Sequence, residues 1–489
     1  MEGSTLKRKA LSGFIWVAIR NCAKIFIAFI SGIILARLLT PYDYGCIGML
    51  ALFMTLSSTF IDAGFGEALI QKKNPTNTDF STIFFWNMGM SIVLYFVLYF
   101  SAPAIARFYD ISILCPVLRV QALVLIIQAF NIVQKNLLKK SLNFRFLSIV
   151  NIITTIIAII ATIVMAYCGM GVWSLVTQNL LAAGIPAVVF WFHLKWRPTW
   201  TFSLNSFREL FSFGVYVLLS NFLNKLGEQI QVLLIGKLFS ATTLGYYSKA
   251  SSTERMSSQV ISGVVTSVVY PLYAETQNDK KALANIIKRI MMSVSFLLFP
   301  FMLILILLAK PIFLLLYSER WLPSVIYFQV LCFVGISACL QSVNQQTIAA
   351  IGKSKVMFTW TLLKRFLGSV GVIGGLIFYG MKGFLVGIVF YNYLSYFVNI
   401  GLVSKYIGYK WTRQLKDLSH VTAMSLTSFT ASYVSTLFVS SSCIYVIGAI
   451  RLVTFLAVYI GWSLIIKPEA YVYTISNIPS LKYREKKRG

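Results

Sequence analysis

Acidic residues and histidines are scarce in this chain. Only 15 of its 489 residues are Asp or Glu and two are His, and charged residues together make up 12%, about half the share that is usual in soluble domains. The two histidines, His193 and His420, lie far apart, and no HExxH, GxSxG or glycine-rich phosphate loop occurs. The sequence therefore lacks the motifs of metalloproteases, α/β-hydrolases and P-loop ATPases, and we predict that the protein is not an enzyme.

Cysteine pairs and long polar segments are also missing. The seven cysteines lie in or beside apolar runs and form no CxxC pair, so the sequence predicts neither a bound metal nor a disulfide framework. The longest segments between apolar runs, such as 194–210 and 272–289, are under about 20 residues and too short for a catalytic domain,.

Apolar residues dominate what is present. They make up 58% of the chain, and the mean hydropathy is +0.77. An apolar run of about 18 to 20 residues can cross a bilayer as a helix, because every backbone polar group is then paired within the segment. We predict an all-α polytopic membrane protein of about 14 transmembrane helices, the first of them uncleaved, over residues 12–35, 45–70, 82–103, 112–134, 147–168, 171–193, 211–236, 243–271, 290–309, 322–350, 356–379, 383–404, 418–439 and 444–466.

Basic residues alternate between the two predicted sides of the membrane. If the N-terminus is cytoplasmic, the cytoplasmic segments hold 28 of the 43 Lys and Arg residues and the opposite side holds six. Such a bias is typical of multi-pass proteins, and an even number of spans places both termini in the cytoplasm. The net charge of +28 is then mostly a topology signal, and we expect no nucleic-acid partner.

The chain repeats itself at an offset of 200 residues. ARLLTPYDYGCIGML from Ala36 matches GKLFSATTLGYYSKA from Gly236, and Asn21 and Gly45 match Asn221 and Gly245. Six spans separate the copies, so the halves have the same orientation, as in parallel transporter repeats. We predict two parallel six-helix bundles around a central cavity, with a bundle at 1–193, a cytoplasmic linker at 194–210, a bundle at 211–405, two extra helices at 406–466 and a basic cytoplasmic tail at 467–489.

Polar side chains inside the predicted spans form stripes. Because a buried charge is costly in lipid, such residues normally face a bundle interior or a watery cavity. Arg20 and Lys24 are i, i+4 neighbours and share one helix face. The candidate cavity residues are Arg20, Asn21, Lys24, Asn221, Lys225, Arg255, Gln341 and Asn344, and Gln121, Gln128 and Gln134 form a further stripe. An ion pair between Lys225 and Glu228 is an alternative role for both.

Basic residues outnumber acidic ones inside the spans, which favours an anionic cargo. Guanidinium and ammonium groups bind phosphate through charge-assisted hydrogen bonds. A pyrophosphate headgroup fits this charge, and amides and hydroxyls could replace the water around a sugar.

The motifs at the start of the chain resemble those of a known family. LARLLTPYDYG follows LSGFIWVAIRNCAKI, and FIDAGFGEALIQKKN closes the second span. Together they are similar to the N-terminal pattern of bacterial polysaccharide transporters, the lipid-linked oligosaccharide flippases related to the colanic acid exporter, which belong to the multidrug/oligosaccharidyl-lipid/polysaccharide exporter superfamily. The resemblance covers roughly residues 5–410.

This resemblance implies a function and a location. The protein is expected to turn an undecaprenyl-pyrophosphate-linked oligosaccharide across the bacterial cytoplasmic membrane by alternating access, for capsule, O-antigen, lipopolysaccharide or exopolysaccharide synthesis. It implies membrane lipid, the lipid-linked oligosaccharide, and a polymerase and export machinery as partners, and no cofactor. Cations of the first span help to bind pyrophosphate in related flippases, and Arg20 and Lys24 have such positions. H⁺ or Na⁺ coupling occurs in the superfamily, for which Asp62, Glu228 and Glu254 are candidates.

Three alternatives remain open. A drug or ion antiporter of the same superfamily would share the bundles, but its cationic substrates would favour an acidic cavity. A lipid II flippase fits the charge equally well and is disfavoured mainly by the LARLLTP resemblance. A membrane glycosyl polymerase should carry a large external loop with Arg or His chemistry, and the sequence has no such loop.

Overall fold

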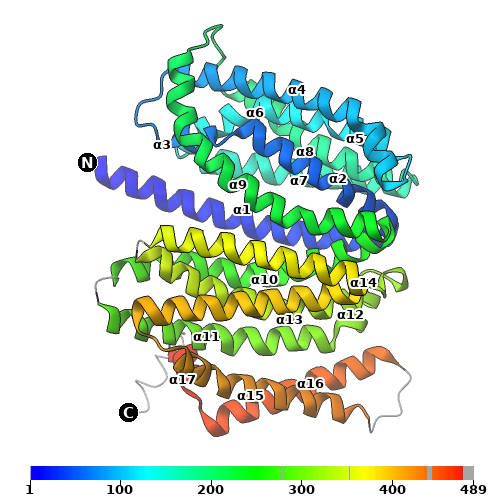
Figure 1. Ribbon diagram of the computed structural model, residues 1–489, viewed down its shortest axis with the longest axis vertical. Helices are drawn as coiled ribbons and strands as arrows, with labels where there is room; N and C mark the ends of the chain where they lie inside the picture. The colour runs from blue at the N-terminus through cyan, green and yellow to red at the C-terminus, as the bar shows by residue number, and fades with distance from the viewer. Residues whose placement is uncertain (1, 277–278, 352, 438–442, 477–489) are drawn as a thin grey trace. The chain divides into compact units, whose positions relative to one another are not determined.

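The computed structural model describes residues 2–276, 279–351, 353–437 and 443–476, and these residues fold into helices (Figure 1). In chain order the elements are α1 (Glu2–Leu38), α2 (Pro41–Asp62), α3 (Phe65–Gln71), α4 (Asn77–Tyr109), α5 (Leu114–Gln121), α6 (Leu123–Lys140), α7 (Phe144–Tyr167), α8 (Val172–His193), α9 (Leu204–Leu238), α10 (Ala241–Glu275), α11 (Lys280–Leu307), α12 (Ala309–Leu316), a 3₁₀ turn (Glu319–Trp321), α13 (Ser324–Ala350), α14 (Ser354–Ile407), α15 (Trp411–Ser435), α16 (Ile444–Ile466) and α17 (Glu469–Ser476). The predicted all-α class is confirmed.

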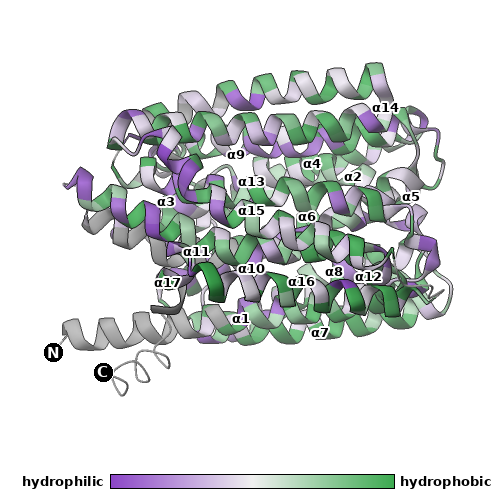
Figure 2. Ribbon diagram, turned by 90° about the horizontal axis from the view of Figure 1, so that it is seen from below, coloured by the Kyte–Doolittle hydropathy of each residue, from purple (hydrophilic) through white to green (hydrophobic). Residues whose placement is uncertain are grey.

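The helices have the length and composition of a multi-pass membrane protein. In the described residues, ten helical segments are long and apolar enough to cross a membrane, and Figure 2 shows hydrophobic residues, in green, along the helices. The described parts of the predicted spans are mainly helical, but the 45–70 span is divided between α2 and α3, and the 112–134 span between α5 and α6. The spans 356–379 and 383–404 are the two arms of α14, which breaks at Gly380 with φ of 62°. Residues 438–439 of the thirteenth span and 477–489 of the tail lie outside the described residues.

The chain forms two compact units, Met1–Ser248 and Lys249–Gly489. In the first unit α1 packs against α7, α2 against α9, and both α4 and α8 against α6. In the second unit α11 and α14 pack against α13, while α15 contacts both α11 and α16. Helix α9 therefore packs with the first unit, and the division into bundles of 1–193 and 211–405 stays a prediction.

The motif DAGFGEAL separates α2 from α3 by a sharp break. Ala63 and Gly64 both have left-handed backbone conformations, with φ of 44° and 75°. A residue in this region ends a right-handed helix, and glycine adopts it without strain. A Cβ on Gly64 would lie 2.5 Å from the carbonyl oxygen of Gly214 in α9. The break therefore allows the α2–α3 corner to meet the α9 backbone directly.

A lysine side chain closes the far end of α3. Lys140 Nζ donates hydrogen bonds to the carbonyl oxygens of Leu69 at 3.0 Å and Ile70 at 3.3 Å, and also to that of Lys72. The last carbonyls of a helix have no partner within the helix, and a cation is favoured there by the helix dipole. Lys140 therefore fixes the short α3 to the end of α6.

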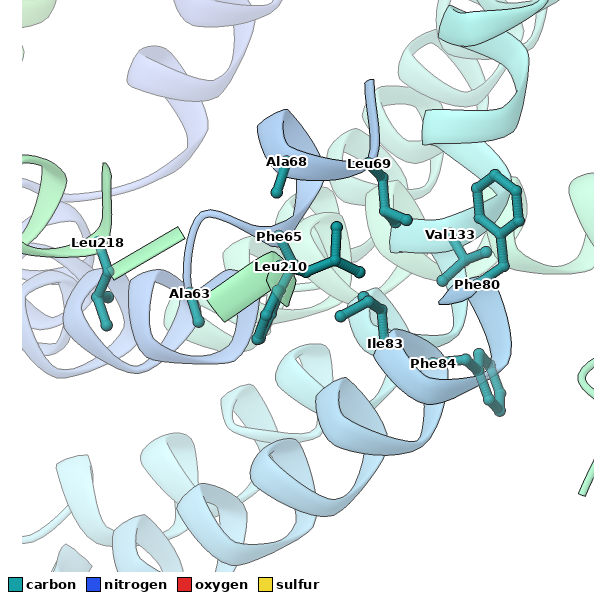
Figure 3. Packing of buried hydrophobic residues seen from close by; sticks show 10 residues of the cluster. All are labelled: Ala63, Phe65, Ala68, Leu69, Phe80, Ile83, Phe84, Val133, Leu210 and Leu218. Atoms are coloured by element: carbon teal, nitrogen blue, oxygen red, sulfur yellow. The ribbon is translucent and has the colours of Figure 1, made fainter. Parts of the chain in front are cut away.

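Aromatic packing holds the start of α9 against this corner. Figure 3 shows Phe65 and Ile83 with Leu210 of α9 in one buried cluster, whose members are Ala63, Phe65, Ala68, Leu69, Phe80, Ile83, Phe84, Val133, Leu210 and Leu218. Lys72 forms ion pairs with Asp79 at 3.0 Å and Glu209 at 2.9 Å. Helices α3, α4 and α9 thus meet through both apolar and ionic contacts.

At the opposite end of these helices, the repeated glycines bring the starts of α2 and α10 into contact. A Cβ on Gly45 would lie 1.8 Å from the carbonyl oxygen of Ala241, and one on Gly245 would lie 1.8 Å from the carbonyl oxygen of Pro41. Backbones can approach this closely only where side chains are absent. The repeated sequences therefore form one helix crossing.

Candidate functional site

A cavity of about 380 Å³ in the first unit contains the basic pair of α1. Its wall carries Arg20, Asn21, Lys24 and Ile27 from α1, Asn151, Ile152, Thr154 and Thr155 from α7, and Ala182 from α8. We call it the cationic cavity, because its charged lining residues are both basic. The structure brings three of the predicted cavity residues together here.

Among the described residues, the basic side chains of this cavity have no acidic partner. Arg20 is half-buried and Lys24 is exposed, and in the described part of the chain neither forms an ion pair. Arg20 donates a hydrogen bond of 3.4 Å to Asn21 Oδ1 on the same helix. Positive charge is thus available to an anion in the cavity.

The polar wall of α7 was not predicted from the sequence. Asn151 Nδ2 donates to the Leu147 carbonyl at 2.6 Å, and Thr155 Oγ1 donates to the Asn151 carbonyl at 2.7 Å. These bonds to the preceding helical turn let polar side chains lie in an apolar helix. The spacing of Asn151, Thr154 and Thr155 on one face was the signal that could have identified this wall.

A second cavity, of about 340 Å³, lies among α2, α5, α6 and α8. We call it the neutral cavity, because its lining contains no acidic or basic side chain. Ala182 borders it as well as the cationic cavity. Its lining is Ile47, Leu50, Ala51, Met54, Thr55, Ser58, Gln121, Val124, Leu125, Gln128, Asn179, Ala182 and Ala183.

The predicted residues of α9 line neither of these two cavities. Asn221, Lys225 and Glu228 are exposed on the first unit. In the described residues the alternative Lys225–Glu228 ion pair is not formed. The cavity role of Asn221 and Lys225 and the coupling role of Glu228 stay predictions.

In the second unit, Gln341 belongs to a chain of hydrogen bonds between α13 and α14. Lys364 Nζ donates to Asn399 Oδ1 at 2.8 Å, Asn399 donates to Gln341 Oε1 at 3.4 Å, and Gln341 Nε2 donates to the Asn392 carbonyl at 3.0 Å. The amide of Gln341 is thus held in an internal network, and its predicted part in cargo binding is untested.

The two other predicted residues of the second unit have contrasting environments. Asn344 is fully buried, and neither its amide nitrogen nor its oxygen has a hydrogen-bond partner in the structure. Arg255 is exposed on α10. Their roles in binding also stay predictions.

The three candidate coupling carboxylates lie on different helices. Asp62 ends α2, and a Cβ on Gly66 would lie 3.2 Å from its Oδ1 and 3.2 Å from Asn136 Nδ2. Glu254 is buried on α10 and accepts a hydrogen bond from Ser258, while Glu228 is exposed. Among the described residues, no group of three or more His, Cys, Asp or Glu side chains could hold a metal ion.

Comparisons with known proteins agree with this membrane fold. The family described as "Polysaccharide biosynthesis protein" matches residues 34–326, more than half of the chain. The teichuronic acid biosynthesis protein TuaB of Bacillus subtilis is 25% identical over 73% of this chain and 74% of its own length. The lipopolysaccharide biosynthesis protein WzxC of Escherichia coli K12 is 22% identical over 88% of both chains.

Solved structures show the same fold at low sequence identity. The lipid II flippase MurJ in an inward closed conformation has a TM-score of 0.72 and 14% identity, covering 93% of this chain and 98% of MurJ. An inward-facing multidrug resistance transporter of the MATE family has a TM-score of 0.61 and 16% identity, covering 81% of this chain and 98% of its own. The chain therefore belongs to the polysaccharide biosynthesis protein family and is a membrane transport protein, not an enzyme, with the fold that MurJ and the MATE transporter share.

Proposed function

We propose that the protein moves an undecaprenyl-pyrophosphate-linked oligosaccharide from the cytoplasmic to the outer face of the bacterial inner membrane by alternating access. The observation that carries this proposal is the cationic cavity, in which Arg20 and Lys24 have no acidic partner among the described residues. The anionic group of this lipid-linked cargo is its pyrophosphate, which can accept several charge-assisted hydrogen bonds from Arg and Lys side chains at once. The names of the relatives, which act in teichuronic acid and lipopolysaccharide biosynthesis, support a glycan cargo.

The same charge distinguishes this proposal from export of cationic drugs. Cationic drugs would be repelled by a cavity whose charged lining residues are Arg20 and Lys24,. Lipid II carries the same pyrophosphate, so the charge does not exclude it, and MurJ shares the fold. The family match and the polysaccharide relatives favour a surface-polysaccharide precursor over lipid II.

The direction of transport follows from the proposed topology. The excess of basic residues in alternate segments supports a topology with both termini in the cytoplasm,, where lipid-linked precursors would enter. A polymerase and export machinery on the outer face would then receive the glycan, and for this step the protein needs no cofactor.

Analysis of lipid-linked sugars in a deletion strain tests the proposal. Complete repeat units should accumulate on the cytoplasmic face, and the intact gene should restore surface polysaccharide. Arg20→Ala and Lys24→Ala should each reduce restoration at least about tenfold, because each removes a charged hydrogen-bond donor, while membrane insertion stays normal. Lys195→Ala, which removes an exposed linker charge outside both cavities, is the matched control.

Two outcomes would contradict the proposal. Accumulation of complete units on the outer face would indicate a polymerase defect. Normal surface polysaccharide in Arg20→Ala and Lys24→Ala would show that these cations do not bind the cargo.

Ion coupling is a separate part of the proposal. Asp62, Glu228 and Glu254 are the carboxylates we assign to it, and Glu254 is the most deeply buried of them. Flipping in proteoliposomes with an imposed H⁺ or Na⁺ gradient should depend on at least one gradient in the intact protein and lose that dependence in Glu254→Gln or Asp62→Asn. Equal rates with and without gradients would show uncoupled transport.

A further inference from the structure

The neutral cavity and the cationic cavity are neighbours with opposite chemistry. Ala182 of α8 borders both of them. The cationic cavity is lined by two basic side chains, and the neutral cavity is lined by none. A ligand that reached across Ala182 would therefore meet charge at one end and uncharged polar groups at the other.

The polar lining of the neutral cavity suits hydroxyl groups. Gln121, Gln128 and Asn179 each present an amide that can donate and accept, and Thr55 and Ser58 add hydroxyls,. Sugar hydroxyls also donate and accept, so they can satisfy both kinds of group. The volume of about 340 Å³ lies within the usual range for small-molecule sites, about 300 to 1,000 Å³.

One of these amides is buried without a partner. Gln121 is 6% exposed, and its Oε1 forms no hydrogen bond in the structure. An unpaired buried polar atom is unfavourable, so a ligand hydroxyl that donated to Gln121 Oε1 would be bound selectively.

Other ligand classes fit the neutral cavity less well. A coupling cation would find no compensating negative charge, because the lining contains no carboxylate,. A lipid tail would leave Gln121, Gln128 and Asn179 unpaired against hydrocarbon, which is costly. Uncharged hydroxylated rings are the remaining class that satisfies the lining.

We propose that the neutral cavity binds the sugar ring nearest the carrier phosphate while the cationic cavity binds the pyrophosphate. This inference rests on the proposed function and adds a glycan compartment inside the first unit. Selectivity for the first sugar of the glycan then resides in Gln121, Gln128 and Asn179, and affinity for the carrier resides in Arg20 and Lys24.

Binding of two probes to the purified full-length protein separates these roles. One probe is synthetic undecaprenyl pyrophosphate, and the other is the lipid-linked glycan that accumulates in the deletion strain. Native mass spectrometry titrations should show tighter binding of the glycan-bearing probe to the intact protein. Gln121→Leu should weaken that probe about tenfold and change the Kd of undecaprenyl pyrophosphate less than twofold, whereas Arg20→Ala should weaken both probes.

A matched control and a second variant keep the test decisive. Asn87 is also buried with an unpartnered amide, but it lines neither cavity, so Asn87→Leu should leave the Kd of both probes unchanged. If Gln121→Leu fails to fold by size-exclusion chromatography, Asn179→Leu replaces it with the same expectation.

The contrary outcomes identify which proposal fails. Full retention of the glycan-dependent affinity in Gln121→Leu and Asn179→Leu would overturn the sugar compartment. Equal weakening of both probes by Gln121→Leu would do the same. Arg20→Ala without effect on either probe would instead overturn the proposed function.

Discussion

Gly45 and Gly245 lie at one helix crossing, each against the backbone of the other's helix. Gly45 faces the carbonyl of Ala241, and Gly245 faces the carbonyl of Pro41. The four positions are related pairwise by the same offset of 200 residues. Each copy of the repeat thus supplies both a glycine and the carbonyl that faces the other copy's glycine, as in a two-fold symmetric interface.

Valine at either glycine should separate the two helices. The added Cβ would lie 1.8 Å from a carbonyl oxygen, and backbone cannot yield as a side chain can, so we expect Gly45→Val and Gly245→Val each to destabilise the protein by at least about 3 kcal/mol. The melting temperature in detergent measures this effect. Gly89→Ala, where nothing lies within 4 Å, is the control, and an unchanged melting temperature in Gly45→Val would refute the crossing.

Removal of the ammonium group of Lys140 should loosen α3. Lys140→Met leaves the carbonyls of Leu69, Ile70 and Lys72 without this donor, which we expect to cost about 1 to 2 kcal/mol locally. Hydrogen exchange of the α3 amides should rise about tenfold. Lys139→Met removes the neighbouring exposed charge and should leave α3 exchange unchanged; a similar rise in both variants would point to net charge instead.

The ion pairs of Lys72 should stabilise the meeting of α3, α4 and α9 unequally. Asp79 is 1% exposed and also accepts from the Thr76 backbone at 2.8 Å, whereas Glu209 is 61% exposed. We expect Asp79→Ala to cost about 2 kcal/mol and Glu209→Ala less than about 0.5 kcal/mol. Urea titrations compare the two, and an equal cost would contradict the burial argument.

The contribution of Lys72 should not change between pH 6 and 9. Partial burial opposes its charge, but hydrogen bonds with Glu209 and Asp79 outweigh this effect and raise the pKa of Lys72 above its ordinary value. A raised pKa gives stability that is fully present below the ordinary pKa, about 10.4, and is lost only as pH rises through the folded value. Unfolding titrations of the intact protein and Lys72→Met should therefore differ by the same free energy across this range.

Lys288 should fasten the C-terminal helices to α11. Its Nζ lies 2.5 Å from Glu469 of α17 and 3.7 Å from Asp417 of α15. Lys288→Met removes both pairs, and hydrogen exchange in α17 should rise several-fold. Asp417 keeps its 2.6 Å hydrogen bond from Tyr409, so α15 should change less. Lys281→Met removes an exposed charge about two helical turns before Lys288 in α11, and should not affect α17.

The helices could be predicted from the sequence because apolar length alone specifies a spanning segment. The breaks within them could not. Ala63 ends α2 in a left-handed conformation that alanine rarely adopts, and the surrounding contact of Gly64 with Gly214 joins residues 150 positions apart. Local sequence does not report such long-range contacts, so the 45–70 span was predicted as continuous.

The candidate site was only partly predictable for a similar reason. Arg20 and Lys24 stood out because charge is rare in a spanning helix, and both line the cationic cavity. Asn151 and Thr155 did not stand out, since single polar residues occur in many apolar helices. Gln341 also stood out, but its amide forms hydrogen bonds with Asn392 and Asn399 of α14. The packing of α13 against α14 turns Gln341 toward that helix, and the sequence of α13 alone does not reveal this orientation.

The contacts that hold α9 also bear on how the protein is made. Asn221, Lys225 and Glu228 make α9 polar, and it is not among the ten segments apolar enough to cross a membrane within the described residues. A nascent helix of this kind partitions poorly into lipid on its own. Helices α2, α3 and α4 are synthesised before α9 and contact it. We therefore expect these earlier helices to help α9 to insert into the membrane. Substitutions of Phe65 or Lys72 that weaken these contacts should reduce the yield of inserted protein before they affect transport.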